Sequence, residues 1–105
     1  MSNDKLLSFL GLCKRAGCLI SGADTVTRAV CDGKAVLVLY VSDVSDNSLK
    51  QVLRAAHSHD VPARMLPRSK EELSFALGKH CGIVCTTDHG FAKKILVLLS
   101  DQQLN

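Results

Sequence analysis

The sequence predicts an α/β fold in which a small sheet lies between helices. Patterns typical of helices and of strands alternate along the whole chain, as one helix followed by four strand–helix pairs. The run at residues 35–41 is apolar at every position, which is typical of a strand that is covered on both faces. No linker or repeat interrupts this alternation, so we expect residues 1–105 to form one domain with an ordered core at about residues 3–100.

The first part of the chain predicts two helices joined by a strand. Asn3 is a suitable N-cap for a first helix, whose apolar residues recur at helical spacing until Gly17 ends it. Residues 18–20 form a short apolar strand. We expect Ser21 to be the N-cap of the second helix, which runs to about Asp32, because its hydroxyl can accept a hydrogen bond from a free backbone N–H group.

The middle of the chain predicts two strands on either side of a third helix. The strand at residues 35–41 is followed by Ser45, which is a good cap for that helix. A short strand at residues 63–66 comes next, and Pro67 closes it. We expect right-handed crossovers wherever neighbouring strands are parallel, and edge strands this short can include one antiparallel member.

The last part of the chain adds two more helices and a strand. Ser69 and Glu72 have the spacing of a capping box at the start of the fourth helix. A loop with a glycine at each end, Gly78–Gly82, leads to a strand at residues 83–86. Either residue of the pair Thr87-Asp88 can cap the final helix.

Composition favours a cytoplasmic protein without a disulfide framework. The five cysteines are an odd number and the N-terminus does not resemble a signal peptide, so we expect reduced thiols. No apolar run reaches the roughly 18 residues that span a bilayer. His80, Cys81, Cys85 and His89 are an alternative set of metal ligands, but tetrahedral zinc sites usually show tighter paired spacing. We therefore expect no metal and no other cofactor.

The motifs of common enzyme classes are absent from the sequence. It contains no P-loop, no dinucleotide-binding glycine turn and no nucleophile elbow. Asp43 and Asp88 follow strands, where α/β enzymes often keep catalytic carboxylates, but capping and turn duties are commoner there. We expect a protein that is not an enzyme.

Two segments can form a binding surface together. Gly22 leaves the backbone open at the start of the second helix, where free N–H groups and a partial positive charge suit a phosphate. The alternative is an ordinary amphipathic helix with an ion pair between Asp24 and Arg28. If the strand at residues 83–86 neighbours the strand at 18–20, the loop before it opens at the same edge. RNA with a distorted backbone fits such a surface better than duplex DNA.

The chain resembles the kink-turn RNA-binding ribosomal protein family, which also includes a spliceosomal protein and small bacterial members of the YlxQ and YbxF type. The bacterial YlxQ-type branch is the most similar. The resemblance implies a three-layer α-β-α sandwich with a small four-stranded mixed sheet. It also implies recognition of a kink-turn, an RNA bend with tandem sheared G·A pairs and a flipped-out base. The matching stretches are residues 10–17, Ser21-Gly22, Gly33–Ala35, Val41–Asp43, Arg68–Leu73 and Thr87–Ala92.

The resemblance also implies which residues bind RNA. In the family, Gly-x-Asn-Glu-x-x-Lys at the start of the second helix reads the G·A pairs, and a loop with a nearby lysine surrounds the flipped-out base. The residues of this chain that match these motifs are Gly22, Ala23, Asp24, Thr25, Arg28, Lys70, Gly78, Lys79, His80 and Cys81.

The chain departs from the family motif at several of these positions. Asp24 and Thr25 stand where the family has an amide and a carboxylate, and Ser74 stands where many members have glycine. We expect a monomer that binds kink-turn-like RNA, with ribosomal RNA as one candidate. A protein-interaction module that has lost or altered RNA binding is the alternative.

Overall fold

A computed structural model of the chain describes residues 4–103. Helices and strands alternate through most of that range, as the sequence predicts. The elements are α1 (Lys5–Arg15), β1 (Leu19–Ser21), α2 (Ala23–Cys31), β2 (Leu37–Val41), α3 (Asp46–Ser58), β3 (Ala63–Leu66), α4 (Lys70–Leu77), β4 (Ile83–Thr86) and α5 (His89–Gln103). The strands form one four-stranded sheet in the order β1-β4-β2-β3.

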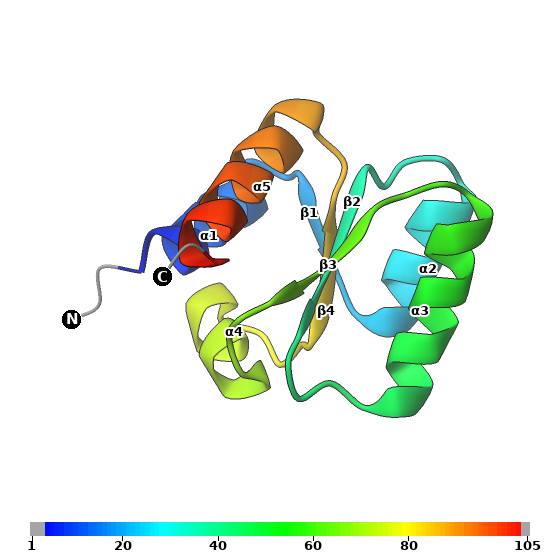
Figure 1. Cartoon of the computed structure of the whole chain (residues 1–105), viewed down its shortest axis with the longest axis horizontal. Helices are drawn as coiled ribbons and strands as arrows, with labels where there is room; N and C mark the ends of the chain where they lie inside the picture. Colours follow the sequence, from blue (N-terminus) through cyan, green and yellow to red (C-terminus); the bar gives the residue numbers. More distant parts are fainter. Residues whose placement is uncertain (1–3, 104–105) are drawn as a thin grey trace.

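The sheet is the middle layer of a three-layer sandwich, which confirms the predicted fold class. Figure 1 shows α1, α4 and α5 on one side of the sheet and α2 and α3 on the other. Apolar side chains fill the space between the sheet and each helical layer, and alternate residues of β2 pack against the two layers. The first core contains Leu6, Leu10, Leu73, Leu77, Ile95, Leu37 and Leu39, and the second contains Val26, Ala29, Val30, Val52, Ala56, Val38 and Cys85.

One inner strand, β4, runs opposite to the other three. It pairs antiparallel with β1, where Ile20 is opposite Cys85, and antiparallel with β2, where Leu39 is opposite Val84. The pair β2 and β3 is parallel. The edge strand β1 is therefore antiparallel to its neighbour, as the sequence analysis allowed, but the reversed strand of the sheet is an inner one.

The reversed direction of β4 explains why a helix as short as α4 is sufficient to connect β3 to β4. A connection between antiparallel strands begins and ends at the same edge of the sheet, so the chain need not cross back over it. The eight residues of α4 occupy this connection, and the capping box that the sequence predicts is present. The Ser69 hydroxyl accepts from the Glu72 N–H group at 3.1 Å, and the Glu72 carboxylate accepts from the Ser69 N–H group at 2.8 Å.

Two other predicted caps are confirmed and two need correction. Ser45 accepts from a backbone N–H group in the first turn of α3, and Asp88 does so at the start of α5. Asn3 lies outside the described residues, and Asp4 caps α1 instead. The prediction for Ser21 was wrong, because Ser21 is the last residue of β1 and Gly22 takes the N-cap position of α2.

Candidate nucleic-acid interface

The two segments that the sequence analysis singled out meet at one edge of the sheet. The Gly22 N–H group donates to the Ile83 carbonyl at 3.0 Å, which joins the start of α2 to the start of β4. The Val41 N–H group donates to the Gly82 carbonyl at 3.0 Å, which joins the end of β2 to the same loop. Because β4 is antiparallel, its first residue lies beside the last residues of β1 and β2. The sequence analysis made this meeting conditional on β1 and β4 being neighbours, and the two strands are paired.

The start of α2 has backbone N–H groups that are free to bind an anion. Gly22 has a φ of 101°, a conformation that side-chain-bearing residues rarely adopt. Within residues 4–103, no side chain caps this helix and no acceptor contacts the N–H groups of Ala23, Asp24 or Thr25. The helix dipole places a partial positive charge at the same point. A phosphate group can therefore be held there by backbone donors alone.

Three hollows lie along this edge, and they share lining residues. One, of about 190 Å³, is lined by Gly22, Ala23, Lys70, His80 and Cys81 among others. A second, of about 310 Å³, brings Thr25 and Lys79 together with Lys14. The third continues along α4, with Lys70, Gly78, Lys79 and His80 in its lining. The structure thus brings together residues that lie far apart in the sequence.

Asp24 and Arg28 are the two predicted site residues that line none of these hollows. Both are exposed on α2. The Asp24 carboxylate accepts a hydrogen bond from the Gln51 amide of α3 at 3.1 Å. In the described part of the chain, Asp24 does not form an ion pair with Arg28 within 4.0 Å. The alternative of an ordinary helix that carries this ion pair is therefore wrong in that detail.

The loop before β4 is held by two contacts that the sequence analysis did not predict. The Ser74 hydroxyl donates to the Cys81 carbonyl at 3.2 Å and accepts from the Cys81 N–H group at 3.1 Å. The Lys14 ammonium group donates to the Leu77 carbonyl at the end of α4. Neither contact has a local spacing signal. The one visible sign was that Ser74 replaces the glycine of many family members.

The two carboxylates that follow strands serve as helix caps. Asp43 accepts from the Lys70 N–H group at 2.7 Å, at the start of α4. Asp88 accepts from the Phe91 N–H group at 2.8 Å, at the start of α5. The commoner of the two roles considered for these residues is the one observed.

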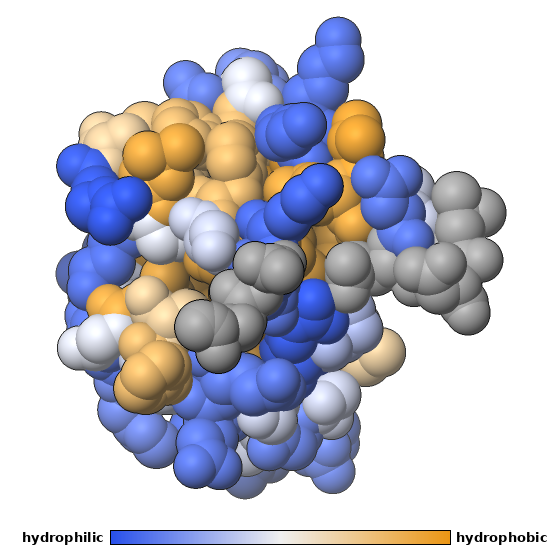
Figure 2. Space-filling model, turned by 90° about the vertical axis from the view of Figure 1, so that its left-hand side faces the viewer, coloured by the Kyte–Doolittle hydropathy of each residue, from blue (hydrophilic) through white to orange (hydrophobic). Residues whose placement is uncertain are grey.

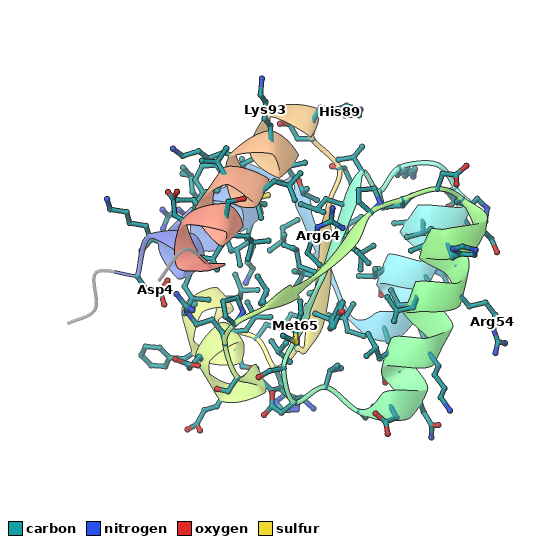
Figure 3. All side chains as sticks on the ribbon, in the orientation of Figure 1. Asp4, Arg54, Arg64, Met65, His89 and Lys93 are labelled. Carbon is teal, nitrogen blue, oxygen red and sulfur yellow. The ribbon has the colours of Figure 1, made fainter. Side chains whose placement is uncertain are left out.

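The four possible metal ligands are spread over the sheet. Cys81 packs in the core on the α1 side and Cys85 in the core on the α2 side, where burial raises its pKa to about 12. His80 precedes β4, whereas His89 begins α5 at the other end of that strand (Figure 3). Across residues 4–103, no three His, Cys, Asp or Glu side chains are grouped to hold a metal ion. No helix in this range has the length and apolar character needed to cross a bilayer.

Comparisons with known proteins agree with this arrangement. Two curated relatives cover nearly the whole chain. The RNA-binding protein YlxQ of Bacillus subtilis is 35% identical over 100 residues, which are 94% of this chain and 99% of that protein. The RNA-binding protein YlxQ of Enterococcus faecium is 32% identical over 98 residues, which are 93% of this chain and 94% of that protein.

Solved structures share the fold. A Bacillus halodurans protein of unknown function superposes with a TM-score of 0.86 at 32% identity, covering 93% of this chain and 99% of its own. The 15.5 kD RNA-binding protein of Giardia lamblia superposes with a TM-score of 0.71 at 20% identity, covering 96% of this chain and 90% of its own. Residues 4–97 match the Ribosomal protein L7Ae/L30e/S12e/Gadd45 family, and the chain belongs to that family.

Proposed function

We propose that this protein binds RNA at a kink-turn-like bend, as a cytoplasmic monomer, and that it is not an enzyme. The observation that carries the proposal is the junction of the α2 start with the loop Gly78–Gly82 at one edge of the sheet. The names of the curated relatives, which are RNA-binding proteins, support the partner class. Ribosomal RNA is one candidate source of such a bend.

The chemistry of this edge suits a sharply bent phosphate backbone. Free N–H groups at the start of α2 can receive one phosphate, and Lys70 and Lys79 provide cations across the adjoining hollows. An RNA bend brings phosphates of two strands close together, so donors from two separate segments can contact both. A straight duplex presents no such convergence.

Asp24 and Thr25 alter the contacts that the family resemblance implies for α2. An ionised carboxylate cannot donate a hydrogen bond to an RNA acceptor, and it repels phosphates. The Gln51 amide donates a hydrogen bond to the Asp24 carboxylate, and this contact orients the carboxylate toward α3. Asp24 and Thr25 therefore favour the alternative function, in which the same edge of the sheet binds a protein. The experiment must separate RNA binding from protein binding.

The test is binding of a kink-turn hairpin as a function of salt concentration, with a straight duplex of equal length as the control. We expect tighter binding to the hairpin and a linear fall of log K with log salt. Arg28→Ala and Lys79→Ala should each weaken binding and lower the slope by about 0.7–0.9, the value for one phosphate contact. Lys93→Ala is the matched control, because Lys93 lies on α5 at the other end of the sheet (Figure 3). Equal affinity for both RNAs, with unchanged slopes, would favour the protein-interaction alternative.

A further inference from the structure

One aromatic side chain stands out on the surface beside the proposed RNA site. Phe75 of α4 is 90% exposed, whereas the other exposed large apolar residues in the described part of the chain, Leu12, Met65 and Val97, are 45–50% exposed. Figure 2 shows the side of the molecule that α1, α4 and α5 cover, where apolar surface lies among polar side chains. Phe75 thus has almost its whole ring free, while each of the others is about half covered.

The position of Phe75 ties it to the proposed site. It lines the hollow of about 600 Å³ that also contains Lys70, Gly78, Lys79 and His80. Phe75 also borders a second hollow, whose lining includes Arg15 of α1. An exposed ring beside lysine side chains can hold an unpaired nucleotide, because the ring stacks on the base while the cations attract its phosphate.

Acidic side chains also line the two hollows beside Phe75. Asp43 and Glu71 line the same hollow as Phe75, and Asp4 and Glu72 line the neighbouring one. Asp43 accepts from the N–H group at the start of α4, and Glu72 accepts from the Ser69 N–H group in the capping box. These carboxylates keep their charge, so the two hollows are of mixed charge, and Lys70 and Lys79 are the cations beside Phe75 that can pair with RNA phosphates.

We propose that Phe75 stacks on an unpaired base of the bound RNA, outside the contacts made by α2 and by the loop Gly78–Gly82. This inference rests on the proposed RNA-binding function and adds a contact to it. Stacking needs a free ring face and tolerates any base, because every base has a π-face. The stacking contact adds affinity for RNA that has an unpaired nucleotide beside the bend. Because the phenylalanine ring is uncharged, this contact does not involve a phosphate.

The chain contains no tryptophan, so a substitution can report on this contact directly. Phe75→Trp introduces a single indole whose fluorescence is quenched when a base stacks on it. Val97→Trp is the matched control, since Val97 lies on α5 and is 49% exposed. We expect quenching of the Phe75→Trp protein by the kink-turn hairpin, over the concentration range in which a labelled hairpin shows binding to the wild-type chain. The Val97→Trp protein should show no quenching.

Affinity measurements complete the test. Phe75→Ala should weaken hairpin binding by between about 5-fold and about 140-fold, the range for loss of one stacked base. Its salt slope should equal that of the wild type, in contrast to Lys79→Ala, because no phosphate contact is lost. Phe75→Leu should bind nearly as weakly as Phe75→Ala, since leucine keeps an apolar surface but lacks a π-face.

The outcomes separate this inference from the function on which it rests. If wild-type protein binds the hairpin but Phe75→Ala binds equally well and Phe75→Trp is not quenched, the stacking contact is refuted and RNA binding stands. If Phe75→Leu retains wild-type affinity, the contact is apolar packing and stacking is again refuted. If the wild-type chain does not prefer the hairpin to the straight duplex, both proposals fail and Phe75 belongs to a protein-binding surface.

Discussion

Replacing Ser74 with alanine tests how the loop before β4 is held. The Ser74 hydroxyl makes one hydrogen bond to the Cys81 N–H group and one to the Cys81 carbonyl. Cys81 is 5% exposed, so water cannot easily replace the hydroxyl. Ser74→Ala would therefore leave a donor and an acceptor of the backbone without partners, which costs more than the loss of an exposed hydrogen bond.

The size of the effect follows from these contacts. Two neutral hydrogen bonds contribute about 2 kcal/mol to the free energy of unfolding. Alanine is a better helix former than serine by up to about 0.5 kcal/mol, which offsets part of that loss in α4. We therefore expect a net destabilisation of about 1.5 kcal/mol, which corresponds to a fall in Tm of about 6–12 °C for a domain of this size.

Urea unfolding of the wild type and of Ser74→Ala measures this difference. Ser100→Ala is the matched control, because Ser100 is an exposed serine of α5 with the same change in helix propensity. The control should be as stable as the wild type or slightly more stable. Hydrogen exchange at the Cys81 amide should become faster in Ser74→Ala. If the two variants are equally stable and that amide stays protected, the Ser74 hydroxyl does not hold the loop.

Three further predictions concern other parts of the site and its support. Asp24→Asn should bind the kink-turn hairpin about tenfold more tightly, a gain of about 1.4 kcal/mol, because the substitution removes a repulsive charge and adds an N–H donor. Titration of both proteins at one salt concentration measures this gain, and equal affinity would contradict the prediction. The Arg68 guanidinium holds the pKa of Asp4 below its ordinary value of 3.8. The stabilisation by this pair should thus be complete above that value and be lost as the pH falls through the lower folded pKa, and Asp4→Asn should remove this pH dependence in urea unfolding. Gly22→Ala should destabilise the chain by about 1–3 kcal/mol, because the φ of 101° is strained for alanine, and unchanged stability would show that the backbone relaxes there.

Local signals in the sequence were sufficient for most elements of the fold. The capping box at Ser69 and Glu72 and the cap at Ser45 depend on residues three apart, so spacing alone reveals them. The apolar strand ending at Val41 is buried on both faces, as its composition indicates. Each of these features arises from neighbours in the chain, and the structure confirms each one.

The features that the sequence did not reveal depend on distant parts of the chain. Ser21 has a suitable side chain for a cap, but pairing with Val84 of β4 draws it into the sheet and leaves Gly22 at the start of α2. The inner position of β4 also follows from tertiary packing, which no periodicity encodes. In the candidate site, the hydrogen bonds of Ser74 and the exposed position of Phe75 were not predicted, because both depend on what surrounds these residues in space.

The inner place of β4 in the sheet also determines at what stage of synthesis the candidate RNA-binding surface can form. This strand is the last to be synthesised, yet it lies between β1 and β2. Until Thr86 has left the ribosome, β1 has no strand to pair with and the start of α2 has no loop beside it. Such long-range pairing closes late and slowly. A nascent or truncated chain without β4 therefore lacks the junction between the start of α2 and the loop Gly78–Gly82. A ligand that requires this junction binds only the folded chain, and it stabilises that state by mass action.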